Sequence, residues 1–131
     1  MKVNRGRMPE APSDQRGPTF TGEVWADPIL QDIPGVGVNT VFFPPGGRTF
    51  WHYHEQGQIL LVTHGLGCVR TRSGEGAWVR SGDVVFFEAD EEHWHGAGDT
   101  SYLVHIAISL GATEWLEEVT EEDYHAAITS A

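Results

Sequence analysis

Short apolar stretches alternate with turn signals along most of the chain after Phe20. The stretches VGVNTVFF, GQILLVTH and YLVHIAIS end near glycine, proline or other turn residues, and no helical spacing of apolar residues occurs before Gly111. Runs of about five to eight residues with frequent glycine turns are typical of the strands of a sandwich or a barrel. The pattern therefore predicts an all-β domain.

Alternation within the last of these stretches separates two faces of one strand. Leu103, His105, Ala107 and Ser109 share a face, because successive side chains of a strand point to opposite sides. A histidine in so apolar a strand is either a structural residue bonded to a neighbour or part of a cavity wall. Both interpretations of His105 stay open at this point.

The end of the chain follows a different period. In TEWLEEVTEEDYHAAI, Trp115, Leu116 and Val119 have helical spacing, and Thr120 with Asp123 resembles a capping box. We therefore expect short C-terminal helices from about residue 112, with a second helix starting near Thr120.

The beginning of the chain is polar and rich in proline. Residues 1–19 contain Pro9, Pro12 and Pro18 among polar neighbours, which predicts a flexible N-terminal arm. The length of 131 residues fits one domain, large enough to bury roughly two-thirds of the surface that its unfolded chain exposes. We expect an arm over 1–19 and a single domain over 20–131.

The net charge of −11 is unevenly distributed. Residues 1–16 hold four of the eight basic residues, whereas Glu114–Asp123 hold six acids and no base. Nucleic acid needs a basic face that neutralises phosphates, so we exclude it as a partner. No apolar run approaches the roughly 20 residues of a membrane span. The lone Cys68, interpreted as an apolar filler, agrees with a reducing compartment, and we expect a cytoplasmic protein.

Four histidines suggest one shared metal site. On a strand, His52 and His54 project from the same face about 7 Å apart, and Gln58 keeps that parity if the strand continues. An isolated His-x-His pair is usually just polar surface. Here His93 and His95 follow a second apolar run, which favours a site shared between two strands.

These two segments resemble the paired motifs of the cupin family. The residues that match the spacing of the two motifs are Gly46, His52, His54, Gln58, Gly65, Gly82 and His93. The resemblance covers roughly residues 36–109. It implies a small jelly-roll β-barrel with a divalent metal ion inside, and the implied ligands are His52, His54, Gln58 and His93.

The chain departs from the family pattern at two places. Gln58 stands where the motif usually has glutamate, and an amide oxygen is a neutral donor, so the charge of the ion stays uncompensated. Such a site binds metal less tightly, is a stronger Lewis acid and accepts an anionic ligand. The alternative is a decayed site without metal. Before His93, the sequence EADEE replaces the usual Pro-x-Gly, so another kind of turn is expected there.

A narrower resemblance is to small single-domain cupins related to carboxymuconolactone decarboxylase-associated proteins, and especially to bacterial cupin hydroxynitrile lyases. The segments that carry it are HYHEQGQILLVTHGLG, GDVV, HWHGA, HIAI and EWLEEVTEEDY. It implies a manganese-type site that cleaves an (R)-cyanohydrin into an aldehyde and cyanide. The implied catalytic residues are Thr49, His95 and His105, and the implied pocket residues are Asn39, Val41 and Ser109.

The native ion and the reaction have alternatives. Nitrogen and oxygen ligands suit several ions, of which we favour Mn or Fe and keep Zn, Ni and Co. The same site could serve an iron-dependent dioxygenase or oxidase, or a non-catalytic protein that binds a small ligand. In QILLV and YLVHIAI, apolar residues occur on both faces of the predicted strands. We therefore expect the outer face of the sheet to be covered by another subunit or by the terminal helices, and we favour a homodimer.

Overall fold

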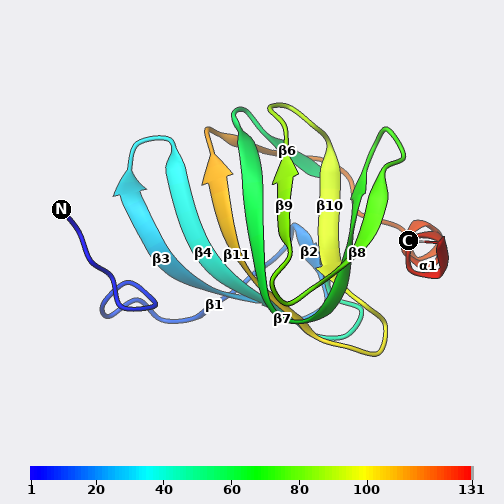
Figure 1. Cartoon of the computed structure of the whole chain (residues 1–131), viewed down its shortest axis with the longest axis horizontal. Coiled ribbons are helices and arrows are strands. Elements are labelled where there is room, and N and C mark those ends of the chain that lie inside the picture. The colour runs from blue at the N-terminus through cyan, green and yellow to red at the C-terminus, as the bar shows by residue number, and fades with distance from the viewer. Residues whose placement is uncertain (131) are drawn as a thin grey trace.

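Antiparallel strands make up most of the chain and curl into a partly closed barrel, as the computed structural model of residues 1–130 shows (Figure 1). The prediction of an all-β jelly roll is confirmed. The elements are β1 Asp14–Gln15, β2 Phe20–Thr21, β3 Trp25–Ile33, β4 Val36–Phe43, β5 Arg48–Thr49, β6 His52–His54, β7 Gly57–Thr71, β8 Gly76–Arg80, β9 Val84–Phe87, β10 His93–Ala97, β11 Leu103–Leu110, β12 Thr113–Trp115 and α1 Glu121–Ser130.

The long strand β7 belongs to both sheets of the barrel. Its first half pairs with β11 and β9, and its second half pairs with β10 and β8. Gly65 lies between the two halves with φ +83°, where a Cβ atom would come within 2.0 Å of the carbonyl oxygen of Tyr102. Only glycine fits a left-handed backbone at so close an approach. This contact explains why a glycine closes the first motif.

The second sheet consists of β2, β5, β6, β8, β10, β12 and the second half of β7. Two apolar clusters lie on its opposite faces. Inside the barrel, Phe43, Leu60 and Leu103 belong to the main core. Outside it, Trp94 packs with residues of α1. All five residues of β10 are buried as a result. The histidines lie directly beside the main core, where Phe43 and Phe87 pack against their rings.

Strand alternation correctly predicted which residues of β11 face inward. Leu103, His105 and Ala107 are buried, whereas the residues between them are only half-buried. Cys68 lies in the outer cluster, and burial raises the pKa of its thiol to about 12. At neutral pH this cysteine is therefore an uncharged thiol with no exposed surface.

Helix α1 begins after Thr120, as predicted. The prediction of another helix before it, from about residue 112, is wrong. The backbone N–H of Asp123 donates to Oγ1 of Thr120 over 3.1 Å. The preceding residues instead form β12, which pairs with β6, and the N–H of Leu116 donates to the carbonyl of Trp51. The free edge of β6 offers hydrogen bonds along an extended chain, and this tertiary pairing outweighs the local helical period. No helix within residues 1–130 has the length and apolar character that crossing a membrane requires.

Replacing Thr120 with alanine is expected to destabilise the protein by about 1 kcal/mol, because the Asp123 N–H loses its acceptor. Urea unfolding followed by tryptophan fluorescence measures the change. Thr129→Ala is the matched control, since Thr129 lies exposed in the last turn of the same helix and its hydroxyl bonds to the helix carbonyls of His125 and Ala126. Equal effects of the two substitutions would contradict the capping role.

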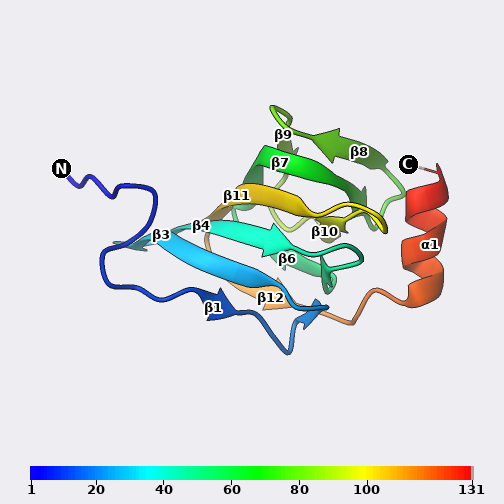
Figure 2. The same cartoon turned by 90° about the horizontal axis from the view of Figure 1, so that it is seen from below.

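The N-terminal segment runs along the barrel instead of away from it between residues 14 and 21. Strand β1 pairs with β3, β2 pairs with β5, and the N–H of Arg16 donates to the carbonyl of Val24 over 2.7 Å. Figure 2 shows β1 beside β3 at the edge of the sheet. The mobility of residues 1–19 stays a prediction, but their last part has a defined place, and it forms one wall of the central cavity.

Candidate metal centre

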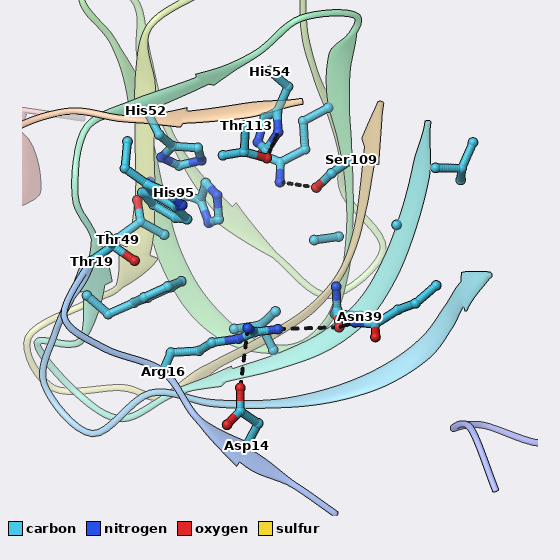
Figure 3. Close-up of a pocket in the computed structure, with 18 of the residues that line it drawn as sticks. Asp14, Arg16, Thr19, Asn39, Thr49, His52, His54, His95, Ser109 and Thr113 are labelled. Carbon is cyan, nitrogen blue, oxygen red and sulfur yellow. Dashed lines mark hydrogen bonds and ion pairs between the residues drawn. The ribbon is translucent and has the colours of Figure 1, made fainter. Parts of the chain in front are cut away.

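A cavity of about 630 Å³ opens between the two sheets, and its wall carries most of the residues implied by the sequence (Figure 3). Strands β4, β5, β6, β7, β10, β11 and β12 all contribute to it, together with the segment around Arg16. The predicted site residues that line the cavity are Asn39, Val41, Thr49, His52, His54, Gln58, His95 and Ser109. The remaining two, His93 and His105, are buried against these residues.

Backbone carbonyls fix the tautomers of two histidines. His52 and His93 lie opposite one another in the pairing of β6 with β10. Nδ1 of His52 lies 2.9 Å from the carbonyl oxygen of Phe50, and Nδ1 of His93 lies 2.7 Å from that of Glu91. A carbonyl only accepts hydrogen bonds, so both Nδ1 atoms carry the proton. In the neutral rings, each Nε2 atom therefore has a free lone pair that can bind a cation.

Three imidazoles are close enough to hold one ion. His52, His93 and His95 each offer a nitrogen, and these nitrogens lie within 4.8 Å of one another. The sequence implied His54 in place of His95, and His54 is also near, with its ring centroid 5.1 Å from that of His52. Its Nδ1 bonds to Oγ1 of Thr113 over 2.9 Å, and its buried Nε2 has no partner within residues 1–130.

Gln58 lies among the implied histidine ligands. Its Oε1 is 3.0 Å from Nε2 of His93, and its Nε2 donates to Oγ of Ser109 over 3.1 Å. Because Nδ1 of His93 already carries the proton, this arrangement places two acceptors face to face. A cation between them resolves the conflict, and without a cation the amide must turn over to donate to His93. The orphaned Nε2 of His54 has the same solution, so the residues present fit a divalent ion.

Burial keeps the site histidines neutral. Desolvation lowers the pKa of His54 to about 4 and that of His93 to about 3. The pKa of His52 also lies well below its usual value, because of burial first and of neighbouring His93 second. A neutral imidazole is the form that binds metal, and protons therefore compete little near neutral pH.

A second pair of histidines lies deeper beside the first group. Nε2 of His105 is 3.0 Å from Nδ1 of His95, so one of these nitrogens donates to the other. The N–H of His95 donates to Oγ1 of Thr49 over 3.2 Å, which fixes the strand against β5. Phe43 packs on both rings, and desolvation lowers the pKa of both histidines. The pair is therefore uncharged near neutral pH. His105 has a hydrogen-bonded partner in His95, which lines the cavity.

Several histidines and tryptophans lie outside the site. His64 and His125 are exposed, and Trp51 and Trp94 pack in the outer cluster. Thr113 and Trp115 were missed as site residues because the segment was assigned to a helix. Trp115 lines the cavity, with its ring centroid 4.5 Å from that of His52. The alternation of Thr113 and Trp115 in TEW was the signal that could have identified them.

The sequence matches a known protein family and a named relative. The cupin domain family matches residues 39–108. A relative from Granulicella tundricola, described as (R)-mandelonitrile lyase, is 43% identical over 117 residues, which cover 83% of this chain and 89% of that protein.

Solved structures agree with this match. A cupin-like protein from Thermotoga maritima is 42% identical, with a TM-score of 0.81 and coverage of 86% of this chain and 90% of that one. A polyketide cyclase from Streptomyces resistomycificus is only 17% identical and shows the fold alone, with a TM-score of 0.72 and coverage of 95% and 92%. The family match spans more than half of the chain, and the histidines of both motifs meet in one barrel. The chain belongs to the cupin family.

Proposed function

We propose that the chain is a metal-dependent lyase of the hydroxynitrile lyase type, which splits an (R)-cyanohydrin into an aldehyde and hydrogen cyanide. The observation that carries the proposal is the 43% identity to an (R)-mandelonitrile lyase over most of both chains. The buried His95–His105 pair supports it, because the reaction needs a neutral base next to the substrate hydroxyl. A cavity of about 630 Å³ also has room for an aryl cyanohydrin.

Two groups of residues divide the chemistry. We assign His52, His54, Gln58 and His93 to the ion and leave His95 free for the substrate. A divalent ion at this site supplies Lewis acidity, which lowers the pKa of a nearby hydroxyl. We favour Mn or Fe as the native ion because nitrogen and neutral oxygen ligands suit them. A cytoplasmic location stays a prediction.

Proton transfer is assigned to Nε2 of His95, which is buried and has no partner within the described residues. We assign the proton of the neutral pair to Nδ1 of His95, which then donates to Nε2 of His105 over 3.0 Å. Nε2 of His95 takes the hydroxyl proton as the C–CN bond breaks and the oxygen becomes a carbonyl. The cyanide that leaves then takes the same proton, which gives hydrogen cyanide and restores the neutral pair. His105 orients His95 and stabilises its positive charge between these two transfers.

Benzaldehyde release from racemic mandelonitrile tests the proposal. Protein loaded with Mn²⁺ or Fe²⁺ is expected to release benzaldehyde from the (R) enantiomer, whereas chelator-treated protein releases it only at the background rate. His95→Ala is expected to keep the metal and lose at least about 100-fold in kcat, the contribution of a general base. Release no faster than background from the loaded protein would overturn the lyase. Oxygen uptake with catechols or diketones by the iron form would favour the dioxygenase instead.

We also propose that the chain forms a homodimer through the outer face of the first sheet, which consists of β1, β3, β4, β9, β11 and the first half of β7. Helix α1 covers the outside of the second sheet, but within residues 1–130 nothing covers the first. Register aligns apolar side chains across neighbouring strands of that face. These residues are Val38, Phe42, Ile59, Leu61, Val84, Phe86, Val104, Ile106 and Ile108.

A second copy is the partner that this face fits. It carries few charges in a chain of net charge −11, so two copies can approach over it without strong repulsion. Four strands of this length cover on the order of 400 Å² by strand spacing and rise. The flanking Trp25 and Tyr102, both partly exposed, extend the apolar area toward the roughly 800 Å² that each partner buries in a stable interface. An apolar face with few charges also suits the same patch of a second copy about a two-fold axis.

Light scattering after size-exclusion chromatography measures the assembly. The wild-type protein is expected to elute as a dimer, and Phe86→Asp, at a side chain that is 58% exposed, is expected to give monomers. Ser73→Asp adds the same charge at an exposed turn outside the face and should leave the dimer intact. A monomeric wild-type protein, or equal behaviour of the two variants, would contradict this interface.

A further inference from the structure

The cavity has a second polar end, far from the imidazoles. Figure 3 shows Arg16 reaching toward Asn39 on one side of the cavity, while His52, His54 and His95 gather on the other. Apolar side chains, including Val41 and Phe20, also line the cavity. A ligand in this cavity thus meets a reactive polar group at one end and a different polar group at the other.

Among residues 1–130, Arg16 is the only permanent cation on the cavity wall. The wall also carries one acid, Asp14, and the three imidazoles on it have pKa values lowered by burial. The backbone of Arg16 is held in place, because its N–H donates to the carbonyl of Val24. Its side chain is 31% exposed, so it faces the cavity and solvent without being buried in protein.

The contacts of the Arg16 guanidinium leave capacity for a ligand. Nη1 lies 3.3 Å from Oδ2 of Asp14, and Nη2 donates to Oδ1 of Asn39 over a long 3.4 Å. Asp14 is 63% exposed, and an ion pair with so exposed a partner is weak in water. Oδ1 of Asn39 also accepts from Gln31 over 3.2 Å, which leaves the amide nitrogen of Asn39 as a further donor. Donors therefore dominate this end of the cavity.

We propose that Arg16 and Asn39 bind a carboxylate group of the substrate. A guanidinium matches a carboxylate with two parallel N–H bonds, and the exposed Asp14 gives way to the ligand. Where it names the substrate, this inference rests on the proposed lyase function: the substrate is a cyanohydrin whose carbon skeleton carries a carboxylate remote from the reacting carbon. The binding of a small aryl carboxylate does not depend on that function.

Binding of 4-formylbenzoate and of benzaldehyde to the metal-loaded protein tests the site. Arg16→Gln is expected to weaken the binding of 4-formylbenzoate about tenfold more than the binding of benzaldehyde, because a charge-assisted bidentate contact is lost. Arg16→Lys should keep part of the difference in affinity between the two ligands, because lysine keeps the charge but cannot make two parallel N–H bonds. Asp14→Asn should strengthen carboxylate binding, because the competing carboxylate is gone. Arg80→Gln, at an exposed arginine of β8 outside the cavity, is the control.

The outcomes separate this proposal from the lyase. If Arg16→Gln weakens the binding of both ligands equally, or of neither, the carboxylate site is overturned. This conclusion holds whether or not the protein cleaves a cyanohydrin. If binding depends on Arg16 but neither mandelonitrile nor its 4-carboxy derivative is cleaved, the site stands and the lyase function is overturned. If both are cleaved, kcat/KM of the wild-type protein should favour the 4-carboxy substrate, and Arg16→Gln should abolish that preference. Cleavage without such a preference would contradict the proposed substrate class.

Discussion

Replacing His93 with alanine is expected to weaken binding of Mn²⁺ at least about 100-fold, more than the loss of a residue that only supports a ligand. His93 takes part in every candidate arrangement: its Nε2 faces Gln58 over 3.0 Å, and it belongs to the group of three imidazoles within 4.8 Å. Its proton lies on Nδ1, so the Nε2 lone pair is available to the ion. Isothermal titration of chelator-treated protein gives the affinity, and metal analysis after dialysis gives the content.

His64→Ala is the matched control for this substitution, because His64 is exposed and lies outside the cavity. It should leave the affinity within about twofold, a difference well under 1 kcal/mol. Circular dichroism of each variant separates loss of the ligand from loss of the fold. Unchanged Mn²⁺ affinity in folded His93→Ala would exclude the metal centre.

The same titration decides between the two possible ligand sets. The sequence implied His54 as a ligand and His95 as a base, whereas the three imidazoles whose nitrogens all lie within 4.8 Å of one another include His95 and not His54. We expect His54→Ala to lower the affinity as strongly as His93→Ala, and His95→Ala to lower it less than tenfold. Within residues 1–130 both histidines have a buried Nε2 without a partner, so the expectation follows the cupin motif spacing, which implies His54 as the ligand. The reverse order would make His95 the ligand.

The sequence alone located the histidines because two local rules agreed. Strand alternation placed His52 and His54 on one face, and the family spacing connected them with His93, which β10 brings directly opposite His52. The same alternation correctly turned His105 inward. These residues lie inside regular strands, where position along the chain determines the direction of a side chain.

Residues contributed by irregular segments could not be predicted in this way. Arg16 lies in a stretch whose composition suggests a mobile arm, and its place in the cavity wall comes from the pairing of β1 with β3. Thr113 reaches His54 only because β12 fills the free edge of β6. Both placements depend on long-range pairing, for which the local sequence carries a weak or misleading signal.

Acid is expected to destabilise the metal-free protein by several kcal/mol between about pH 6.5 and pH 4. Burial lowers the pKa of His93 to about 3 and the pKa values of His54 and His105 to about 4, whereas an unfolded chain takes up protons near the ordinary value of about 6.5. Below that value the unfolded state binds more protons than the folded state, so stability falls as pH falls, until the folded pKa values are reached. Each unit of pKa difference corresponds to about 1.4 kcal/mol.

Urea unfolding of chelator-treated protein at several pH values from 7.5 to 4 measures this loss. His64→Gln should follow the wild-type profile, because His64 is exposed. His105→Asn should start less stable but lose less on acidification, since one buried imidazole no longer resists protonation. A flat profile of the wild-type protein would show that the imidazoles are not held neutral. The metal opposes protonation, because it binds only neutral imidazole. Saturating Mn²⁺ should therefore move the onset of acid unfolding to lower pH in the wild-type protein and leave it unmoved in His93→Ala.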